Sequence, residues 1–241
     1  MIFSFQSDKG NLRELNEDAY AYSYTKDGSF CVAIADGMGG HNCGEIASKL
    51  AVDETIAYLS GVENLKETDF PTVLAQAIQI ANQKIIALSN ESPAYNGMGT
   101  TIVLLLFFKK TVHIAHVGDS RAYRVSHGEI TQLTKDHSYT EELVKIGYLK
   151  REEADKHPRK NVITKALGAF EGSEPDFCAV ELLKDDMIIL CTDGLTNMIT
   201  NEEFADIVNK IKTPDRLCEK LLKTALKNGG RDNVTVAAIK Y

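Results

Sequence analysis

The sequence contains no long hydrophobic run, no Cys-x-x-Cys pair and no excess of basic residues. Its longest apolar run, from Ile102 to Phe108, is far shorter than the roughly 20 residues that a membrane-spanning helix requires. The spacings of the five cysteines do not match a zinc site. The formal net charge of −7 argues against nucleic-acid binding, which needs clustered Lys and Arg, but is compatible with binding of metal cations. We therefore expect neither a membrane nor a nucleic acid as a partner.

The cysteines also bear on the cellular compartment. Their number is odd and no secretory leader is recognisable, a combination typical of proteins in a reducing cytosol. Cys31, Cys178 and Cys191 lie within or beside apolar runs, where a free cysteine behaves as a small hydrophobic residue. We expect a soluble, cytoplasmic and monomeric protein.

Length and composition favour one large domain. The 241 residues are 44% hydrophobic, enough for a sizeable core, and 25% charged, as in ordinary globular proteins. No repeat, low-complexity tract or interdomain linker interrupts the chain. A charged and weakly helical stretch breaks the strand pattern after Ser138. We predict a single domain over residues 1–241, with this stretch as a surface flap over about residues 138–165.

The hydrophobic periodicity predicts two pairs of helices separated by strands. Apolar residues recur at helical spacing over Gly44–Leu59 and Pro71–Leu88, and two more helices are predicted after Thr200 and Thr213. The predicted strands are Met1–Phe5, Ala19–Thr25, Cys31–Asp36, Ile102–Phe108, Val112–Val117, Arg121–Val125, Ile130–Leu133, Asp176–Leu183, Met187–Thr192 and Val234–Ile239. Consecutive strands without crossover helices favour antiparallel pairing. The predicted class is α+β, a four-layer αββα sandwich of two antiparallel β-sheets flanked by pairs of helices.

The stretch from Cys31 to His41 is the most informative in the chain. An apolar run ends in Asp36, and three glycines and His41 follow within five residues. An aspartate at the end of a buried strand is costly unless it pairs with a cation or a metal. Glycines beside it let the backbone approach a ligand closely. An ordinary strand that ends in an Asp-Gly turn is the alternative.

Three further aspartates occupy similar positions. Asp119 and Asp193 each follow an apolar run, Asp232 precedes one, and glycine lies beside or close to all of them. Four carboxylates at strand ends indicate a shared site, in which cations would offset their mutual repulsion. Such hard oxygen ligands suit Mg²⁺ or Mn²⁺. The alternative is four unrelated loop carboxylates.

The motifs around these aspartates resemble those of the metal-dependent serine/threonine protein phosphatases of the type-2C (PPM) family, in their compact bacterial form. They occur in the family's order along nearly the whole chain. They are Arg13-x-x-Asn16-Glu17-Asp18, Asp36-Gly37-Met38-Gly39-Gly40-His41 with Gly44-Glu45, Gly99-Thr100-Thr101, Val117-Gly118-Asp119-Ser120-Arg121, Leu133-Thr134-x-Asp136-His137-Ser138, Thr192-Asp193-Gly194-Leu195 and Asp232-Asn233-Val234-Thr235. Each motif alone is weak, whereas seven in order are specific.

The resemblance implies two Mn²⁺ or Mg²⁺ ions per chain, with a weaker third. By similarity, Asp36 bridges two metals and the Gly37 carbonyl completes one of them. The remaining ligands implied by the family are Asp193 and Asp232 for the first metal, Glu17 and Asp18 for the second, and Asp119 together with Asp193 for the third. A metal-bridging water or hydroxide would attack phosphorus directly, without a phosphoenzyme.

Two further side chains gain catalytic roles from the resemblance. Arg13 would neutralise the phosphoryl oxygens, because its planar fork matches a phosphate. His41 would donate a proton to the leaving seryl or threonyl oxygen. A surface cation at Arg13 and a turn histidine at His41, or one that bonds a metal-bound water, are the alternatives. His116 and His137 are interpreted as structural, and Asp136 as organising the start of the flap.

The resemblance predicts a phosphatase for phosphoserine and phosphothreonine on proteins, opposing a bacterial Ser/Thr kinase. The flap and the basic residues Arg159, Lys160 and Lys165 would shape recognition of protein substrates. A catalytically idle relative that only binds phosphoproteins is the alternative from another class, but no expected metal aspartate is missing. A phosphatase dedicated to a single regulatory partner is a third possibility, although such enzymes usually carry sensor domains.

Overall fold

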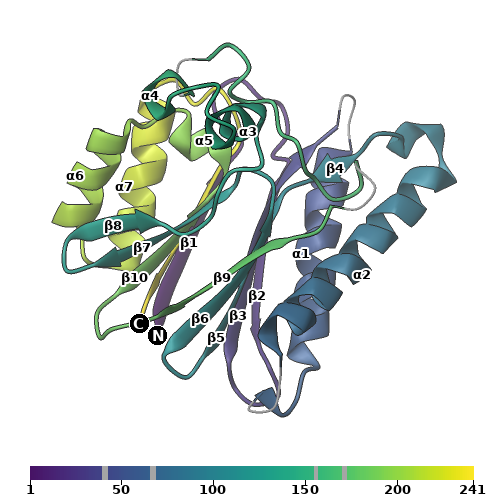
Figure 1. Ribbon diagram of the computed structural model, residues 1–241, viewed down its shortest axis with the longest axis horizontal. Coiled ribbons are helices and arrows are strands. Elements are labelled where there is room, and N and C mark those ends of the chain that lie inside the picture. Colours follow the sequence, from purple (N-terminus) through teal and green to yellow (C-terminus); the bar gives the residue numbers. More distant parts are fainter. Residues whose placement is uncertain (40–42, 66–68, 155–156, 170–172) are drawn as a thin grey trace.

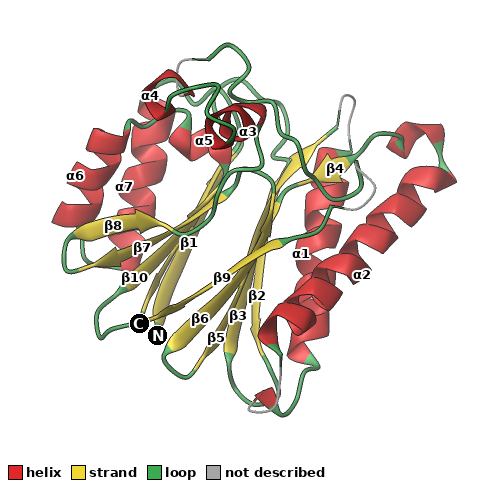
Figure 2. Cartoon of the chain, in the orientation of Figure 1, coloured by secondary structure: helices red, strands yellow, loops and turns green. Residues whose placement is uncertain are grey.

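The computed structural model describes residues 1–39, 43–65, 69–154, 157–169 and 173–241. Two β-sheets lie face to face, and one pair of long helices covers the outer face of each sheet (Figure 1). Figure 2 shows the resulting order of layers, from helices through two sheets to helices. The predicted α+β, four-layer αββα sandwich is thus confirmed.

The elements lie close to the predicted ranges. The helices are α1 (Gly44–Ser60), α2 (Phe70–Glu91), α3 (Tyr139–Lys145), α4 (Arg151–Ala154), α5 (Asp193–Thr196), α6 (Asn201–Lys210) and α7 (Pro214–Lys227), with a 3₁₀ turn η2 (Pro93–Tyr95). The strands are β1 (Ile2–Asp8), β2 (Asp18–Tyr24), β3 (Phe30–Met38), β4 (Gly99–Thr100), β5 (Ile102–Phe108), β6 (Thr111–Val117), β7 (Arg121–Ser126), β8 (Glu129–Gln132), β9 (Asp176–Glu181), β10 (Met187–Cys191) and β11 (Val234–Lys240).

All strand pairs are antiparallel. One sheet has the order β1-β11-β10-β7-β8, and the other has the order β2-β3-β5-β6-β9 with β4 paired to β3. The chain ends lie together, since β1 and β11 pair along their full length from Ile2 opposite Lys240 to Asp8 opposite Val234. The first sheet therefore joins the two termini, and the second is built entirely from the interior of the chain.

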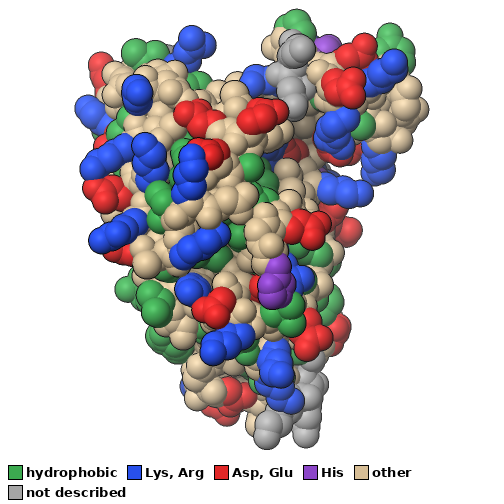
Figure 3. All heavy atoms as spheres, turned by 90° about the vertical axis from the view of Figure 1, so that its left-hand side faces the viewer, with side chains coloured by type: hydrophobic (Ala, Val, Ile, Leu, Met, Phe, Trp, Pro, Cys, Tyr) green, Lys and Arg blue, Asp and Glu red, His purple; other side chains and the backbone are tan. Residues whose placement is uncertain are grey.

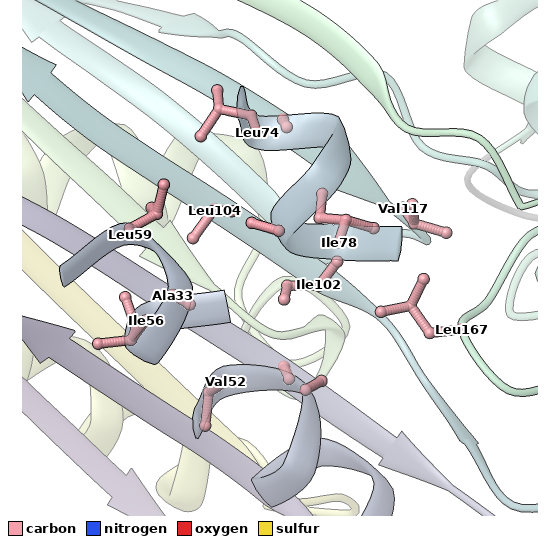
Figure 4. Close-up of a cluster of buried hydrophobic side chains, with 14 of the residues drawn as sticks. Ala33, Val52, Ile56, Leu59, Leu74, Ile78, Ile102, Leu104, Val117 and Leu167 are labelled. Atoms are coloured by element: carbon pink, nitrogen blue, oxygen red, sulfur yellow. The ribbon is translucent and has the colours of Figure 1, made fainter. Parts of the chain in front are cut away.

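Three hydrophobic layers hold the four structural layers together. The first lies between α1, α2 and the second sheet, where Val52 and Ile78 meet Ile102 and Leu104 (Figure 4). The second lies between α6, α7 and the first sheet, and the third between the two sheets. Strands β3 and β5 contribute to both neighbouring layers, which explains why their sequences are apolar throughout.

The predicted capping signals act at the start of α6 and at the end of α7. The Thr200 hydroxyl accepts a hydrogen bond from the Glu203 N–H at 3.2 Å, as expected at an N-cap. At the end of α7, Gly230 has a φ of +51° and its N–H donates to the Ala225 carbonyl at 3.0 Å. The positive φ is available to glycine at little cost, so the chain can turn directly into β11.

One boundary differs from the prediction in a way that matters for the site. The strand expected to end at Asp36 continues to Met38, because β4 pairs with its last residues, Gly37 opposite Thr100 and Met38 opposite Gly99. Asp36 is therefore held inside a strand and does not begin an Asp-Gly turn. A β-strand fixes the direction of the side chain far better than a turn does.

The stretch predicted as a flap contains the short helices α3 and α4. Its two ends meet at the sandwich, where the Tyr139 N–H donates to the Val162 carbonyl and Ser138 pairs with Ile163. Among the described residues, no helix is long and apolar enough to cross a membrane.

Candidate active site

Five aspartates gather in or near the ends of strands from both sheets. Asp36 lies in β3 directly opposite Asp18 of β2. Asp119 follows β6, Asp193 begins α5 just after β10, and Asp232 precedes β11. Each of the other four carboxylates raises the pKa of Asp36 through its charge. The fold therefore brings the four predicted aspartates, and Asp18 with them, into one electrostatic cluster.

Two threonines fix the backbone of Asp36. The Asp36 N–H donates to the Thr101 hydroxyl at 3.0 Å, and its carbonyl accepts from the Thr100 hydroxyl at 2.9 Å. Both threonines are almost fully buried. The side chain of Asp36 is therefore presented from a backbone that is held on both sides of the residue.

Glycine is required at position 37 because other backbone segments fill the space. A Cβ atom there would lie 2.1 Å from the Gly44 carbonyl oxygen and 2.5 Å from that of Glu17. The Gly37 N–H donates to the Glu17 carbonyl at 3.1 Å. This close contact joins the end of β3 to the start of α1 and to the acidic residue before β2. It keeps Glu17 and Asp36 in the same small volume.

Gly194 likewise allows two backbone segments to approach closely, on the other side of the cluster. A Cβ atom at Gly194 would lie 1.9 Å from the Asn233 carbonyl oxygen, so the segments that carry Asp193 and Asp232 touch through their backbones. The Thr192 hydroxyl supports this junction, since it donates to Asp18 Oδ2 at 2.9 Å and accepts from the Thr235 N–H at 3.0 Å.

The electrostatics of the cluster favour cations. Burial first, and the neighbouring aspartates second, raise the pKa of Asp36 well above its usual range. Burial raises the pKa of Asp18 to about 7 and that of Asp119 to about 8, with Asp193 adding to both shifts. The pKa of Asp193 is raised by burial and by Asp232. A set of carboxylates that cannot all ionise in a small volume is stabilised by divalent metal.

The donor atoms of the cluster suit a hard divalent cation. All of them are oxygens, and Asp18 Oδ1 is buried with no hydrogen-bond partner among the described residues. The charge of Asp193 raises the pKa of Asp36, and Asn197 Nδ2 donates to Asp193 Oδ2 at 2.9 Å. In the described part of the chain, no three metal-ligating side chains form a ready-made cage. The all-oxygen donor set and the unpartnered Asp18 Oδ1 nevertheless fit a hard divalent cation.

Arg13 lies at the edge of the cluster. Its Nη2 donates to Asp232 Oδ2 at 2.9 Å, and Nη1 lies 3.8 Å from Glu17 Oε2. Its side chain is 48% exposed, so the guanidinium can turn from Asp232 toward a phosphate at low cost. His41, the predicted proton donor, lies outside the described residues.

Three supporting residues were not assigned a role from the sequence. Asn233 accepts from the Glu17 N–H through Oδ1 and donates from Nδ2 to the Lys9 and Leu15 carbonyls, so it holds the loop that carries Arg13. Thr192 and Asn197 bond Asp18 and Asp193 directly. Thr192 and Asn233 each adjoin a candidate ligand in the sequence, which was the available signal.

Comparisons with known proteins agree with this geometry. The profile of the family described as protein phosphatase 2C matches residues 11–228. The protein phosphatase PhpP of Streptococcus pneumoniae is 40% identical over 247 residues, covering 99% of this chain and 97% of the relative.

Solved structures give the same result. The serine/threonine phosphatase Stp1 from Staphylococcus aureus superposes with a TM-score of 0.93 at 34% identity, covering 100% of this chain and 95% of that chain. The catalytic domain of the serine/threonine protein phosphatase PstP, solved with 2 manganese ions, has a TM-score of 0.85 at 33% identity and covers 98% of this chain and 96% of that chain. The chain therefore belongs to the bacterial protein phosphatase 2C family and is a metal-dependent serine/threonine protein phosphatase.

Proposed function

We propose that this phosphatase acts through the cluster around Asp36, with two Mn²⁺ or Mg²⁺ ions and a weaker third. The convergence of five aspartates from two sheets on one point carries the proposal. Asp36 would be a ligand of two of the metals, and the Gly37 carbonyl would be a ligand of one of them. The other ligands would be Asp193 and Asp232 at the first metal, Glu17 and Asp18 at the second, and Asp119 with Asp193 at the third.

The metals would lower the pKa of coordinated water, which supplies a nucleophile near neutral pH, and would neutralise charge on the phosphate. The residues of the chain supply position. Thr100 and Thr101 hold Asp36, and Thr192 holds Asp18, so the carboxylates are oriented before substrate binds.

Arg13 would bind the phosphoryl oxygens of the substrate. Its Nη2 donates to Asp232 Oδ2, and its guanidinium can offer two parallel N–H groups to a phosphate. His41 would donate the proton to the departing seryl or threonyl oxygen. The loop that carries Arg13 is held by Asn233, which keeps the guanidinium near the cluster.

A cavity of about 460 Å³ lies beside Asp119 and Asp193 and would hold the polypeptide around the phosphorylated residue. Lys160 and Asn161 of the flap line one wall, and α5 with the start of α6 lines the other. Figure 3 shows a hollow in the upper part of the molecule, with acidic and basic side chains near it. The flap, over about residues 138–165, would then select protein substrates. The variant Lys160→Ala tests this role in substrate selection. We expect a lower kcat/KM on a phosphoprotein and an unchanged kcat/KM on p-nitrophenyl phosphate.

The phosphoproteins would be products of a bacterial Ser/Thr kinase, and the chain would act in the cytoplasm as a monomer built on one domain over residues 1–241. These proposals rest on the family. Size-exclusion chromatography with light scattering would test the monomer, and co-purification with a kinase would test the pairing.

The decisive experiment measures turnover of p-nitrophenyl phosphate and of a phosphothreonine peptide with Mn²⁺, with Mg²⁺ and with EDTA. We expect turnover with metal and none with EDTA. Activity that persists in EDTA would refute the metal mechanism. Binding of phosphopeptide without turnover in metal would instead identify a catalytically idle relative.

A further inference from the structure

The turn that carries Asp119 is tied to the base of the flap by one residue, His137. The Gly118 N–H donates to His137 Nδ1 at 3.0 Å, and the His137 N–H donates to the Gly118 carbonyl at 3.0 Å. Because Nδ1 accepts a hydrogen bond, the neutral ring carries its proton on Nε2. The residue is 5% exposed, so this pair of bonds is shielded from water.

Gly118 is closely packed against Thr101. Its φ is +106°, and a Cβ atom would lie 2.5 Å from Thr101 Cγ2. The hydroxyl of the same Thr101 accepts from the Asp36 N–H and shares a hydrogen bond with Ser120. The Gly118 turn therefore packs directly on the residue that fixes the backbone of Asp36.

His137 is also held by contacts with Thr164, His116 and Asp176. Its carbonyl accepts from the Thr164 N–H at 2.8 Å, which joins the two ends of the flap. Its ring stacks on that of His116 at 4.8 Å and 7° between planes, and His116 Nε2 bonds the Lys135 carbonyl at 2.8 Å. Asp176 Oδ1 lies 3.4 Å from His137 Nε2. The ring has one orientation in which it can accept from Gly118.

We propose that His137 is a positioning residue, whose Nδ1 holds the Gly118–Asp119 turn in place relative to Asp36 and the flap. The inference rests on the proposed role of Asp119 in binding the weaker metal. Loss of the acceptor would leave the Gly118 N–H buried and unpaired, and the turn would move to find another partner. The Asp119 carboxylate would be displaced, whereas Asp36, Asp193 and Asp232 would remain in place.

The test compares His137→Leu, which removes the acceptor, with His137→Asn, which places Oδ1 close to the position of Nδ1. His113→Leu is the matched control, since His113 lies on the same strand, β6, and stacks on Phe70 away from this turn. Isothermal titration with Mn²⁺ reports the affinity of each site without turnover. Kinetics on p-nitrophenyl phosphate report kcat and KM.

For His137→Leu we expect the weakest Mn²⁺ site to lose about tenfold or more in affinity and kcat to fall about tenfold or more. The stronger sites and KM should change less than about twofold, and His137→Asn should restore most of the loss. Equal loss at all sites, or no rescue by asparagine, would mean that His137 acts only on stability. Wild-type values for His137→Leu would also overturn the inference.

If His137→Leu does not fold, His137→Gln replaces it, because its carbonyl lies one bond too far to reach the Gly118 N–H. A difference between glutamine and asparagine in the weakest Mn²⁺ site then supports the inference, and identical behaviour refutes it. Failure of the proposed function is distinguishable, because the wild-type protein itself would then show no metal-dependent turnover.

Discussion

Asp18 and Asp36 lie directly opposite each other across the β2–β3 pair. Like charges in this arrangement destabilise a sheet, and Asp18 contributes to the raised pKa of Asp36. Thr192 bonds one oxygen of Asp18, and the other oxygen is buried without a partner among the described residues. The Asp18–Asp36 pair thus lowers the stability of the folded protein at the place where cations are expected to bind.

Removal of metal should make stability fall as the pH rises. The pKa values of Asp18 and Asp119 are raised from 3.8 to about 7 and about 8, so the folded state retains protons that the unfolded state has lost. Their stabilising contribution is complete below pH 4 and is lost as the pH rises through these folded pKa values. Urea unfolding in EDTA at pH 5 and pH 8 should show the lower stability at pH 8. In saturating Mn²⁺ the decrease should disappear, because metal binds the ionised carboxylates. An increase of stability with pH in EDTA would contradict this prediction.

The substitution Asp193→Asn should separate stability from activity. It removes one repelling charge but keeps an acceptor for Asn197, so the metal-free protein should gain on the order of 1 kcal/mol in unfolding free energy. Turnover in Mn²⁺ should fall by at least about a hundredfold, since a metal ligand is lost. Thermal unfolding in EDTA and initial rates in Mn²⁺ measure the two effects. Asp206→Asn, on the exposed face of α6, is the control, and a near-normal rate for Asp193→Asn would refute its role.

Arg13→Ala should lower kcat/KM on p-nitrophenyl phosphate by roughly ten- to a hundredfold, because a charge-assisted bidentate contact to phosphate is lost. Arg13→Lys should recover little, since an ammonium group lacks the planar fork. The side chain is 48% exposed and its pair with Asp232 is exposed, so stability should change little. Arg216→Ala, on α7, is the matched control. Full activity of Arg13→Ala would identify Arg13 as a surface cation.

Gly194→Ala should be poorly tolerated. The new Cβ would lie 1.9 Å from the Asn233 carbonyl oxygen, so the junction of β10 and β11 must open. We expect a loss of several kcal/mol in unfolding free energy and weaker metal binding. Gly61→Ala is the control, since Gly61 has a φ of −84° and its Cβ would meet only Tyr58 O at 3.4 Å. Denaturant unfolding and Mn²⁺ titration would measure both. Equal stability of the two variants would show that the close approach is not required.

Asp186→Asn should weaken the fold without changing catalysis. Burial alone would raise the pKa of Asp186, but hydrogen bonds from Ser126, the Leu183 N–H and Arg124 lower it below the usual value. The charge therefore stabilises the fold above pH 4 and is lost only as the pH falls through the lower folded pKa. We expect the substitution to cost about 2–3 kcal/mol at pH 7 and much less near pH 2. Urea unfolding at both pH values tests this. Asp186 lies at the end of β10 away from Asp193, so kcat should not change, and a reduced kcat would contradict the prediction.

The amino-acid pattern by itself determined the class of fold and most of the candidate metal ligands. Periodic apolar residues predict α1 and α7, and glycine-flanked aspartates predict Asp36 and Asp193, because these signals are local in the chain. The family motifs added Glu17 and Asp18. Each of these expectations depends on a few neighbouring residues, and none requires knowledge of which strands pair.

Tertiary structure alone decided how these residues meet. The pairing of β4 with β3 carries the strand past Asp36, and Asp18 faces it only because β2 takes one register. Thr192 reaches Asp18 across 174 residues of sequence. His137 meets Gly118 where the segment after β8 passes the end of β6. Such contacts depend on packing between distant segments, which a local sequence pattern does not encode.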